Sequence, residues 1–264
     1  MVTPWSLSSV AEVCLRVLQV TDMHLQETPD IEMRGVNPEQ RFLSVLNHLG
    51  AEDADMLLLT GDLSHHSIPA YTRLSDYLQQ LVYPCYWIPG NHDLSGEMFR
   101  FAEQGYGTKS IDLSGWRILM LDSTSMPDGR GGGALSEPEL QFLRTELDEA
   151  AEELNILLVL HHNPVSVNSR WQDSIMLANA DQFWSTVNCY PQVKGVVFGH
   201  VHQTWALERD GVKLFSAPAT AAQFKSRTER PETEDNQELS GPAYATYELC
   251  DDGTITQKVR RLPV

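Results

Sequence analysis

Five short apolar segments of this chain run directly into side chains that carry carboxylate, amide or imidazole groups. Each segment is rich in apolar residues and has the length of a buried β-strand, as in YWIPGNHD at residues 86–93. Helical patterns separate the first three segments, which indicates parallel strands in an α/β arrangement. The carboxyl ends of parallel strands lie along one edge of a sheet, where such folds bind ligands. This repeated ending therefore constrains both the fold and the position of a site.

The polar residues at the strand ends are all of types that bind metal ions. In an extended chain, residues two apart project to the same side, so a D-x-H or H-x-H pair offers two adjacent ligands. Glycine precedes three of the endings and lets the backbone come close to an ion. One such motif is common by chance, but five in succession are not. In chain order the endings supply Asp22 and His24, Asp62, Asn91 and His92, His161 and His162, and His200 and His202.

Capping and turn residues divide the rest of the chain. Asn37 fits the N-cap of a helix that has Pro38 at its first position. Ser136 and Glu139 form a capping-box pattern at the start of another helix. The sequence therefore predicts helices from residue 38, over 71–82 and after 136, and hairpins around 210–211 and 252–253.

The composition restricts the partners and the compartment. A formal net charge of -17 argues against a nucleic acid or an anionic membrane as partner, because both require a basic surface. The four cysteines include no C-x-x-C pair, which favours reduced thiols and a cytoplasmic location. The N-terminus lacks the basic start of a signal peptide. No apolar run approaches the ~20 residues that a membrane span requires.

The motifs D-x-H, G-D, G-N-H-D, H-H-x-P and G-H-x-H occur in this order along the chain. Together they resemble the signature of the calcineurin-like metallophosphoesterases. The resemblance covers residues 15–202. It implies an α/β fold in the form of a four-layer αββα sandwich, with two mixed β-sheets flanked by helices. It also implies one domain over residues 1–264, in which the region from about 215 to 264 completes the second sheet and a lid.

The resemblance implies two metal ions and assigns their ligands. His161 is preferred to His162 because it comes first after its strand and matches the first histidine of the family motif. The ligand atoms are oxygen and nitrogen, which suits manganese, iron or zinc. The first metal would be bound by Asp22, His24, Asp62 and His202, and the second by Asp62, Asn91, His161 and His200.

Within the family, the chain is similar to the bacterial class III 3',5'-cyclic-AMP phosphodiesterases. The stretches RGVN (34–37), WQDSIMLANA (171–180) and APATAAQFK (217–225) carry this likeness. Simpler explanations exist for some residues: Asn37 as a helix cap, Trp171 as core, and His65 with His66 as loop surface. The glycine-rich GRGGG (129–133) is expected to be a flexible connection. The resemblance assigns substrate binding to Asn37, His66, Asn91, His92, Trp171 and Asn179.

The implied reaction is hydrolysis of 3',5'-cyclic AMP to 5'-AMP by in-line attack of a metal-bridging hydroxide. His92 is expected to act as the general acid, or as a cation that stabilises the transition state. Asp93 could orient His92 or cap the turn, and both alternatives stay open. A cyclic nucleotide is the expected partner, and the sequence does not decide whether the chain forms a homodimer.

Two other functions compete with this one. The same metal site would also serve a glycerophosphodiester, a cyclic 2',3'-nucleotide or a phosphomonoester. A scaffold protein that has lost catalysis is less consistent with the sequence, because every expected ligand and His92 are present.

Overall fold

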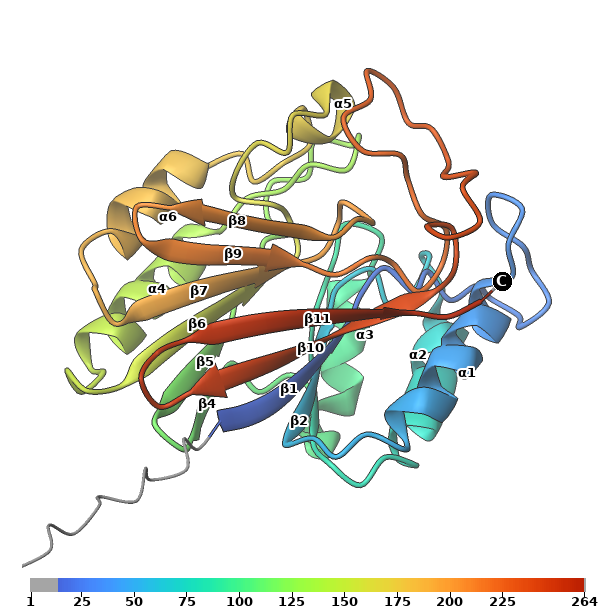
Figure 1. The fold of residues 1–264 in the computed structure, drawn as a ribbon. Helices are drawn as coiled ribbons and strands as arrows, with labels where there is room; N and C mark the ends of the chain where they lie inside the picture. The colour runs from blue at the N-terminus through green and yellow to red at the C-terminus, as the bar shows by residue number, and fades with distance from the viewer. Residues whose placement is uncertain (1–13, 264) are drawn as a thin grey trace, which may run out of the picture.

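Two β-sheets packed face to face, with helices on their outer faces, make up the part of the chain that the computed structural model describes, residues 14–263 (Figure 1). The strands are β1 (Cys14–Val20), β2 (Met56–Thr60), β3 (Cys85–Ile88), β4 (Ser110–Leu113), β5 (Trp116–Met120), β6 (Asn155–Leu160), β7 (Val193–Phe198), β8 (Trp205–Arg209), β9 (Val212–Ser216), β10 (Ala243–Cys250) and β11 (Ile255–Arg261). The helices are α1 (Pro38–Leu49), α2 (Ile68–Leu78), α3 (Ser95–Met98), the 3₁₀ helix η1 (Phe99–Gln104), α4 (Glu137–Asp148), α5 (Arg170–Asp173) and α6 (Ala180–Val187).

Both sheets are mixed. One has the strand order β11-β10-β1-β2-β3, and the other has the order β4-β5-β6-β7-β9-β8. Strands β1, β2 and β3 are parallel, as are β5, β6, β7 and β9, whereas β10, β11, β4 and β8 add antiparallel pairs. The five strand endings are therefore divided between the sheets: β1, β2 and β3 belong to one, and β6 and β7 to the other.

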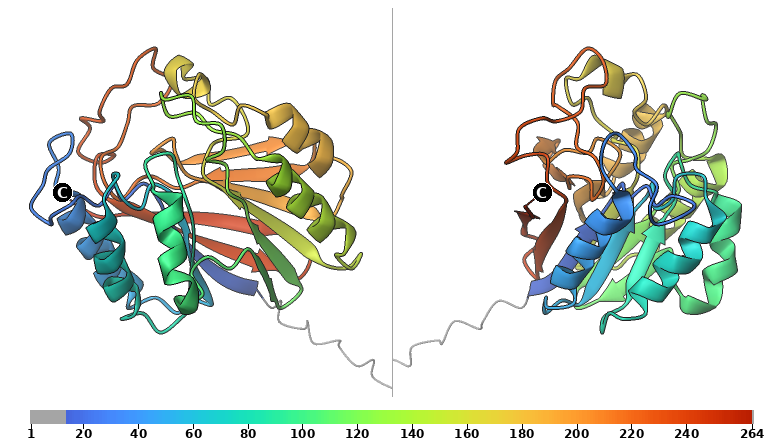
Figure 2. Two further views of the ribbon diagram at one scale, coloured as in Figure 1. Left: turned by 180° about the vertical axis from the view of Figure 1, so that it is seen from behind. Right: turned by 90° about the vertical axis from the view of Figure 1, so that its right-hand side faces the viewer.

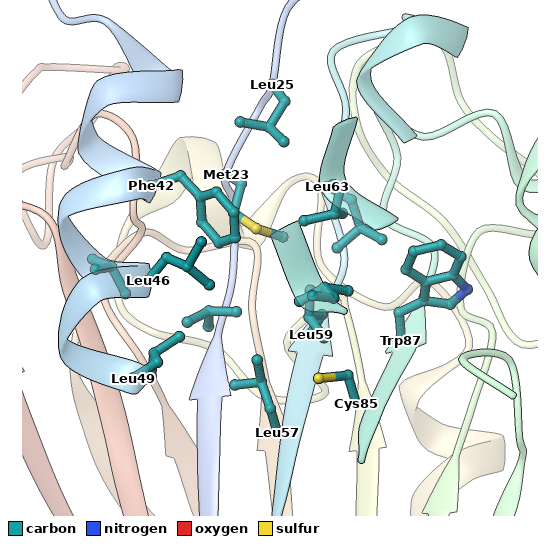
Figure 3. Close-up of a cluster of buried hydrophobic side chains, with 14 of the residues drawn as sticks. Met23, Leu25, Phe42, Leu46, Leu49, Leu57, Leu59, Leu63, Cys85 and Trp87 are labelled. Atoms are coloured by element: carbon teal, nitrogen blue, oxygen red, sulfur yellow. The ribbon is translucent and has the colours of Figure 1, made fainter. Parts of the chain in front are cut away.

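Successive side chains of a strand point to opposite faces of its sheet, so one set packs against the outer helices and the other against the second sheet. In β2, Leu57 and Leu59 pack outward against residues of α1 and α2, and Figure 3 shows them beside Leu46 and Leu49 of α1. Leu58, between them, points into the cluster that fills the space between the two sheets. Helices α4 and α6 cover the outer face of the second sheet in the same way, and Figure 2 shows both outer layers. The predicted four-layer αββα sandwich is confirmed.

The predicted helix starts follow from capping. The Asn37 side chain accepts a hydrogen bond from the backbone N–H of Gln40, and Pro38 opens α1. Ser136 caps α4 by accepting from the N–H of Glu139. Helix α2 differs from the expected 71–82, because it starts at Ile68, where Pro69 fits the first turn, and ends at Leu78.

The C-terminal hairpin corrects one expectation. Strand β10 pairs with β1 and β11 pairs with β10, so residues 243–261 complete the sheet that holds the N-terminal strand, not the second sheet. From about residue 215 onward, only the end of β9 belongs to the second sheet, and residues 229–238 form a largely exposed loop.

The cysteines correct a second expectation. Cys14 and Cys250 are joined by a disulfide between paired positions of β1 and β10, so the prediction of four reduced thiols is wrong for this pair. Cys85 and Cys189 are free. Cysteine usage therefore no longer favours a cytoplasmic location.

Two expectations concern the chain's relation to membranes. The absence of a signal peptide was inferred from the N-terminus, and residues 1–13 lie outside the described residues. No helix in residues 14–263 combines the length and apolar character that crossing a bilayer requires.

Candidate metal centre

The five strand endings converge where the two sheets meet, and three glycines allow this close approach. A Cβ on Gly61 would lie 2.4 Å from Nδ1 of His161, and one on Gly90 would lie 2.3 Å from the amide nitrogen of Asp62. A Cβ on Gly199 would lie 2.2 Å from Oγ1 of Thr21 and 2.7 Å from the carbonyl oxygen of Thr60. Any side chain at these positions would push the endings apart, which explains why glycine precedes three of them.

The first group of candidate ligands consists of Asp22, His24 and His202, all buried, with ligand atoms within 4.8 Å of one another. The Nε2 atoms of His24 and His202 lie 3.2 Å apart. Nε2 of His202 lies 3.3 Å from Oδ1 of Asp22. Two imidazoles and a carboxylate thus face one point from β1 and β7.

The second group consists of Asp62, His161 and His200, which meet the same 4.8 Å limit and are also buried. Nε2 of His161 lies 3.2 Å from Nδ1 of His200 and 3.2 Å from Oδ1 of Asn91. Asn91 therefore lies beside this group. The candidate ligands of the second group follow strands β2, β3, β6 and β7.

Asp62 lies between the two groups. Its Oδ2 atom is 3.6 Å from Nε2 of His24 in the first group and 3.5 Å from Nε2 of His161 in the second. Its Oδ1 atom accepts the backbone N–H of His92 at 2.8 Å. One carboxylate is thus placed to serve both groups.

Each group pairs a carboxylate with a histidine whose pKa it raises. Burial disfavours the charged form of His161, but Asp62, Asp22 and hydrogen bonds outweigh burial and raise the pKa of His161 to about 9. Burial likewise opposes protonation of His202, and Asp22 raises its pKa nonetheless. For His24, burial dominates and lowers the pKa to about 3. In the protein without metal, the carboxylates therefore favour protons bound to these histidines, and such protons supply part of the positive charge that a metal ion would bring.

The residues fit metal ions. Oδ1 of Asp22 is buried, and its one ionic contact among the described residues is Nε2 of His202 at 3.3 Å, so a cation beside it would give the carboxylate a further partner. The Nδ1 atoms of His161 and His202 lie 2.8 Å from the carbonyl oxygen of Thr60 and 2.5 Å from that of Ala222. Such a bond, donated by Nδ1–H, leaves Nε2 free to bind a metal.

Backbone strain is concentrated in the same residues. A positive φ is uncommon outside glycine and costs energy, and it often occurs at functional sites. Five of the candidate ligands have φ between 48° and 70°: Asp22, His24, Asp62, His200 and His202.

His162 has a different environment from His161. Its Nδ1 lies 2.8 Å from Oγ of Ser123, and its Nε2 lies 3.1 Å from the carbonyl oxygen of Gly131. Both ring nitrogens are thus occupied by the protein. The preference for His161 as a ligand agrees with this geometry. The GRGGG segment, expected to be only a connection, packs against His162 and lines the pocket through Arg130 and Gly131.

Asp93 holds the loop that carries Asn91 and His92. Its carboxylate accepts the backbone N–H groups of Leu63, Ser64 and Gly90 at 2.9–3.0 Å and the hydroxyl of Tyr71 at 2.8 Å. Burial and the neighbouring Asp62 raise the pKa of Asp93 to about 7. The carboxylate has no contact with the His92 ring among these bonds, so of the two roles left open, capping the turn agrees with the structure.

A pocket of about 410 Å³ opens over the two ligand groups. His92 and Trp171 line it, and the Trp171 ring meets the Phe224 ring edge-on at 5.0 Å. The Arg34 guanidinium lies 4.9 Å above the centre of the Phe224 ring, and Phe224 also packs on His202. The sequence stretches around 34 and 224 were expected near the pocket, but their pairing depends on loops about 190 residues apart and has no local signal.

Two residues assigned to substrate binding lie elsewhere. Asn37 caps α1, and its Nδ2 donates to the carbonyl oxygen of Pro29. Asn179 bonds the backbone N–H and C=O of Leu135. Neither lines the pocket, because each side chain is used to hold its own segment. The structure therefore does not bring either side chain to this pocket, and their assignment to substrate binding stays a prediction, whereas the helix-cap alternative for Asn37 agrees with the structure.

The two histidines after Asp62 lie beside the ligand groups, although their sequence position also fitted an ordinary surface loop. Nδ1 of His65 is 3.4 Å from Nδ1 of His24, and burial together with His92 lowers the pKa of His65 to about 4. His66 is exposed and does not line the pocket, but its ring contacts His92.

Comparison with known proteins identifies the family. The calcineurin-like phosphoesterase family model matches residues 15–204. A 3',5'-cyclic adenosine monophosphate phosphodiesterase from Vibrio vulnificus is 34% identical over 97% of this chain and 93% of its own length. A 3',5'-cyclic-nucleotide phosphodiesterase from Nostoc is 36% identical over 94% of this chain and 93% of its own length.

Solved structures share the fold at low sequence identity. A dimetal phosphatase from Danio rerio superposes with a TM-score of 0.61 at 13% identity, covering 94% of this chain and 96% of that one. A purple acid phosphatase from yellow lupin superposes with a TM-score of 0.63 at 14% identity, covering 94% of this chain and 52% of that one. The chain belongs to the calcineurin-like phosphoesterase family.

Proposed function

We propose that the protein is a metal-dependent phosphodiesterase that hydrolyses 3',5'-cyclic AMP to 5'-AMP. The observation that carries this proposal is the position of Asp62, which lies between two groups of ligand-type side chains at the base of one pocket. The relatives named as cyclic-nucleotide phosphodiesterases, which match nearly the whole chain, support the choice of substrate.

Asp22, His24, Asp62 and His202 would hold one metal ion, and Asp62, Asn91, His161 and His200 the other. Divalent manganese, iron or zinc at these positions would activate the attacking water and stabilise charge on the phosphoryl oxygens. Two such ions carry four positive charges against the two ligand carboxylates, Asp22 and Asp62. This local excess explains how a chain with a net charge of -17 would bind an anionic phosphodiester.

His92 would protonate the leaving oxygen. It lines the pocket, and its backbone N–H is fixed by Asp62, so the ring is held beside both ligand groups. Opening the cyclic phosphate expels an alkoxide, which is a poor leaving group without a proton. A positioned acid typically contributes about 10²–10⁴ in rate.

The pocket walls would bind the nucleoside. Trp171 and Phe224 offer aromatic surface next to the ligand groups, and Arg34 adds a cation above Phe224. Among the described residues, Arg34 has no carboxylate partner. This combination suits a molecule with both a flat ring and a negative charge.

A hydrolysis panel with the manganese-loaded protein tests the proposal. The substrates are cyclic AMP, cyclic GMP, a cyclic 2',3'-nucleotide, a glycerophosphodiester and a phosphomonoester, and product formation is followed by chromatography. We expect cyclic AMP to give the highest kcat/KM. Cleavage of another ester with no turnover of cyclic AMP would refute the substrate assignment while leaving the family chemistry intact.

The role of His92 is tested in the same assay. A His92→Ala variant should lose about 10²–10⁴ in kcat for cyclic AMP. His48→Ala is the matched control, because His48 lies in α1, with Nδ1 2.9 Å from the carbonyl oxygen of Ser44, and does not line the pocket. Unchanged turnover by His92→Ala would exclude the acid role.

A further inference from the structure

His66 contacts His92 in two ways. Its backbone N–H donates to the carbonyl oxygen of His92 at 3.0 Å, and its ring Nε2 lies 3.1 Å from Nδ1 of His92. His66 has φ of 56°, in the left-handed region that non-glycine residues rarely adopt. A strained backbone at this position thus accompanies a ring that is directed at His92.

The surroundings of the His92 ring leave His66 as its orienting partner. The ring of His65 stacks on it, with centroids 4.6 Å apart and an angle of 23° between the planes, which restrains the ring plane but bonds neither nitrogen. Asp93, the next residue, uses its carboxylate for three backbone N–H groups and Tyr71. Within residues 14–263, His66 is the one side chain hydrogen-bonded to the His92 ring.

We propose that His66 is a positioning residue that accepts the Nδ1–H of His92 and so directs the other ring nitrogen, Nε2, toward the substrate. This inference rests on the proposed acid role of His92. Each ring nitrogen of His92 then has one role: Nδ1 donates its hydrogen to His66, and Nε2 faces the substrate. As the bond from phosphorus to the leaving oxygen breaks, this oxygen takes the proton from Nε2, and His92 becomes neutral while it keeps the Nδ1 proton bonded to His66.

The pairing has a physical advantage over a free imidazole. A histidine that can rotate about its side-chain bonds, or exchange its proton between the two nitrogens, spends only part of its time as a correctly aimed donor. An acceptor at Nδ1 fixes both the ring orientation and the tautomer that remains after proton transfer. Loss of one hydrogen bond to a charged group corresponds to about a tenfold to hundredfold change in rate.

The test compares two substrates that differ in their need for an acid. Cyclic AMP expels an alkoxide, whereas bis(4-nitrophenyl) phosphate expels a stabilised phenolate that leaves without a proton. We expect His66→Ala to lower kcat for cyclic AMP about tenfold to hundredfold with KM little changed, and to leave the aryl diester nearly unaffected. His66→Gln, whose side-chain carbonyl is an acceptor, should recover part of the loss. A merely structural role would lower the rate for both substrates equally, and that result would overturn the inference.

Further variants separate this inference from the proposed function. In a His92→Ala background, His66→Ala should cause no additional loss, because the two residues act as one unit. If His92→Ala loses activity on cyclic AMP but His66→Ala does not, the inference fails and the acid role stands. If His92→Ala has no effect, both fail. His48→Ala controls for removal of an imidazole elsewhere.

A spectroscopic measurement does not depend on turnover. Ring nitrogen shifts in metal-free protein labelled with ¹⁵N-histidine, assigned by comparison with His92→Ala, should report one dominant tautomer of His92 in the wild type and a mixture in His66→Ala. An unchanged His92 spectrum in His66→Ala would overturn the inference whatever the substrate.

Discussion

The replacement of Gly199 by alanine tests whether the candidate site depends on close contact between the two sheets. A Cβ at this position would lie 2.2 Å from Oγ1 of Thr21 and 2.7 Å from the carbonyl oxygen of Thr60, and Cβ atoms essentially never come within 3.0 Å of such neighbours. Thr21 cannot rotate away freely, because its hydroxyl donates to Asp22 at 2.8 Å. The chain next to His200 or its neighbours must therefore shift by about 0.8 Å in total, the difference between 2.2 Å and 3.0 Å.

This shift should affect stability and catalysis differently. Extra volume in a packed interior costs about 1–3 kcal/mol, so the unfolding free energy of the metal-free protein should fall by this amount. A displacement approaching ~1 Å at a catalytic centre can cost about 10² in rate, so kcat should fall tenfold to hundredfold. Urea unfolding and turnover of the metal-loaded enzyme measure the two effects.

Gly107→Ala is the matched control for this experiment. A Cβ on Gly107 would meet nothing within 4 Å, and the residue has no positive φ, so both quantities should stay at wild-type values. A Gly199→Ala protein with wild-type stability and turnover would show that the sheets tolerate separation at this point. The packing account of the site would then be wrong.

Two further predictions concern the disulfide and pH. Denatured protein purified without reductant should show two reactive thiols, from Cys85 and Cys189, and four after reduction; four before reduction would contradict the Cys14–Cys250 bond. Manganese affinity should rise about tenfold from pH 7 to pH 8, because the pKa of His161 is raised to about 9 and the metal must displace that proton. The same raised pKa contributes to the stability of the metal-free protein below pH ~6.5, and this contribution is lost as pH rises through about 9. Calorimetric titration with manganese at each pH measures the affinity, and equal values at pH 7 and 8 would contradict the prediction.

The strands and helices could be predicted because their sequence signals are local, whereas the four-layer sandwich was implied by the family resemblance. Leu57, Leu58 and Leu59 illustrate this point: a continuous apolar run indicates a strand covered on both faces, and both faces of β2 are covered. The candidate ligands could be found for the same reason, since each follows a buried strand by one to four residues. Parallel pairing brings together the ligands that follow strands of one sheet, and the packing of the two sheets brings these two sets to one site.

The features that the sequence did not predict depend on contacts between distant segments. The Cys14–Cys250 bond requires β10 to lie beside β1 in one register, and 236 residues separate the two cysteines. The contact of His66 with His92 depends on a left-handed backbone at His66, and nothing in the neighbouring sequence requires this conformation. Asn37 was given two alternative roles because an asparagine before a helix can cap it or bind a ligand, and only the folded structure shows that its side chain caps α1.

The metal content of the wild type and of Asp62→Ala tests the central claim most directly. Protein dialysed with manganese and then against buffer is analysed by elemental mass spectrometry. We expect two ions per chain in the wild type and a clear loss of both in Asp62→Ala, because this carboxylate lies within 3.6 Å of histidines from each group. Wild-type protein that retains no metal, or an Asp62→Ala variant that still holds two ions, would contradict the account.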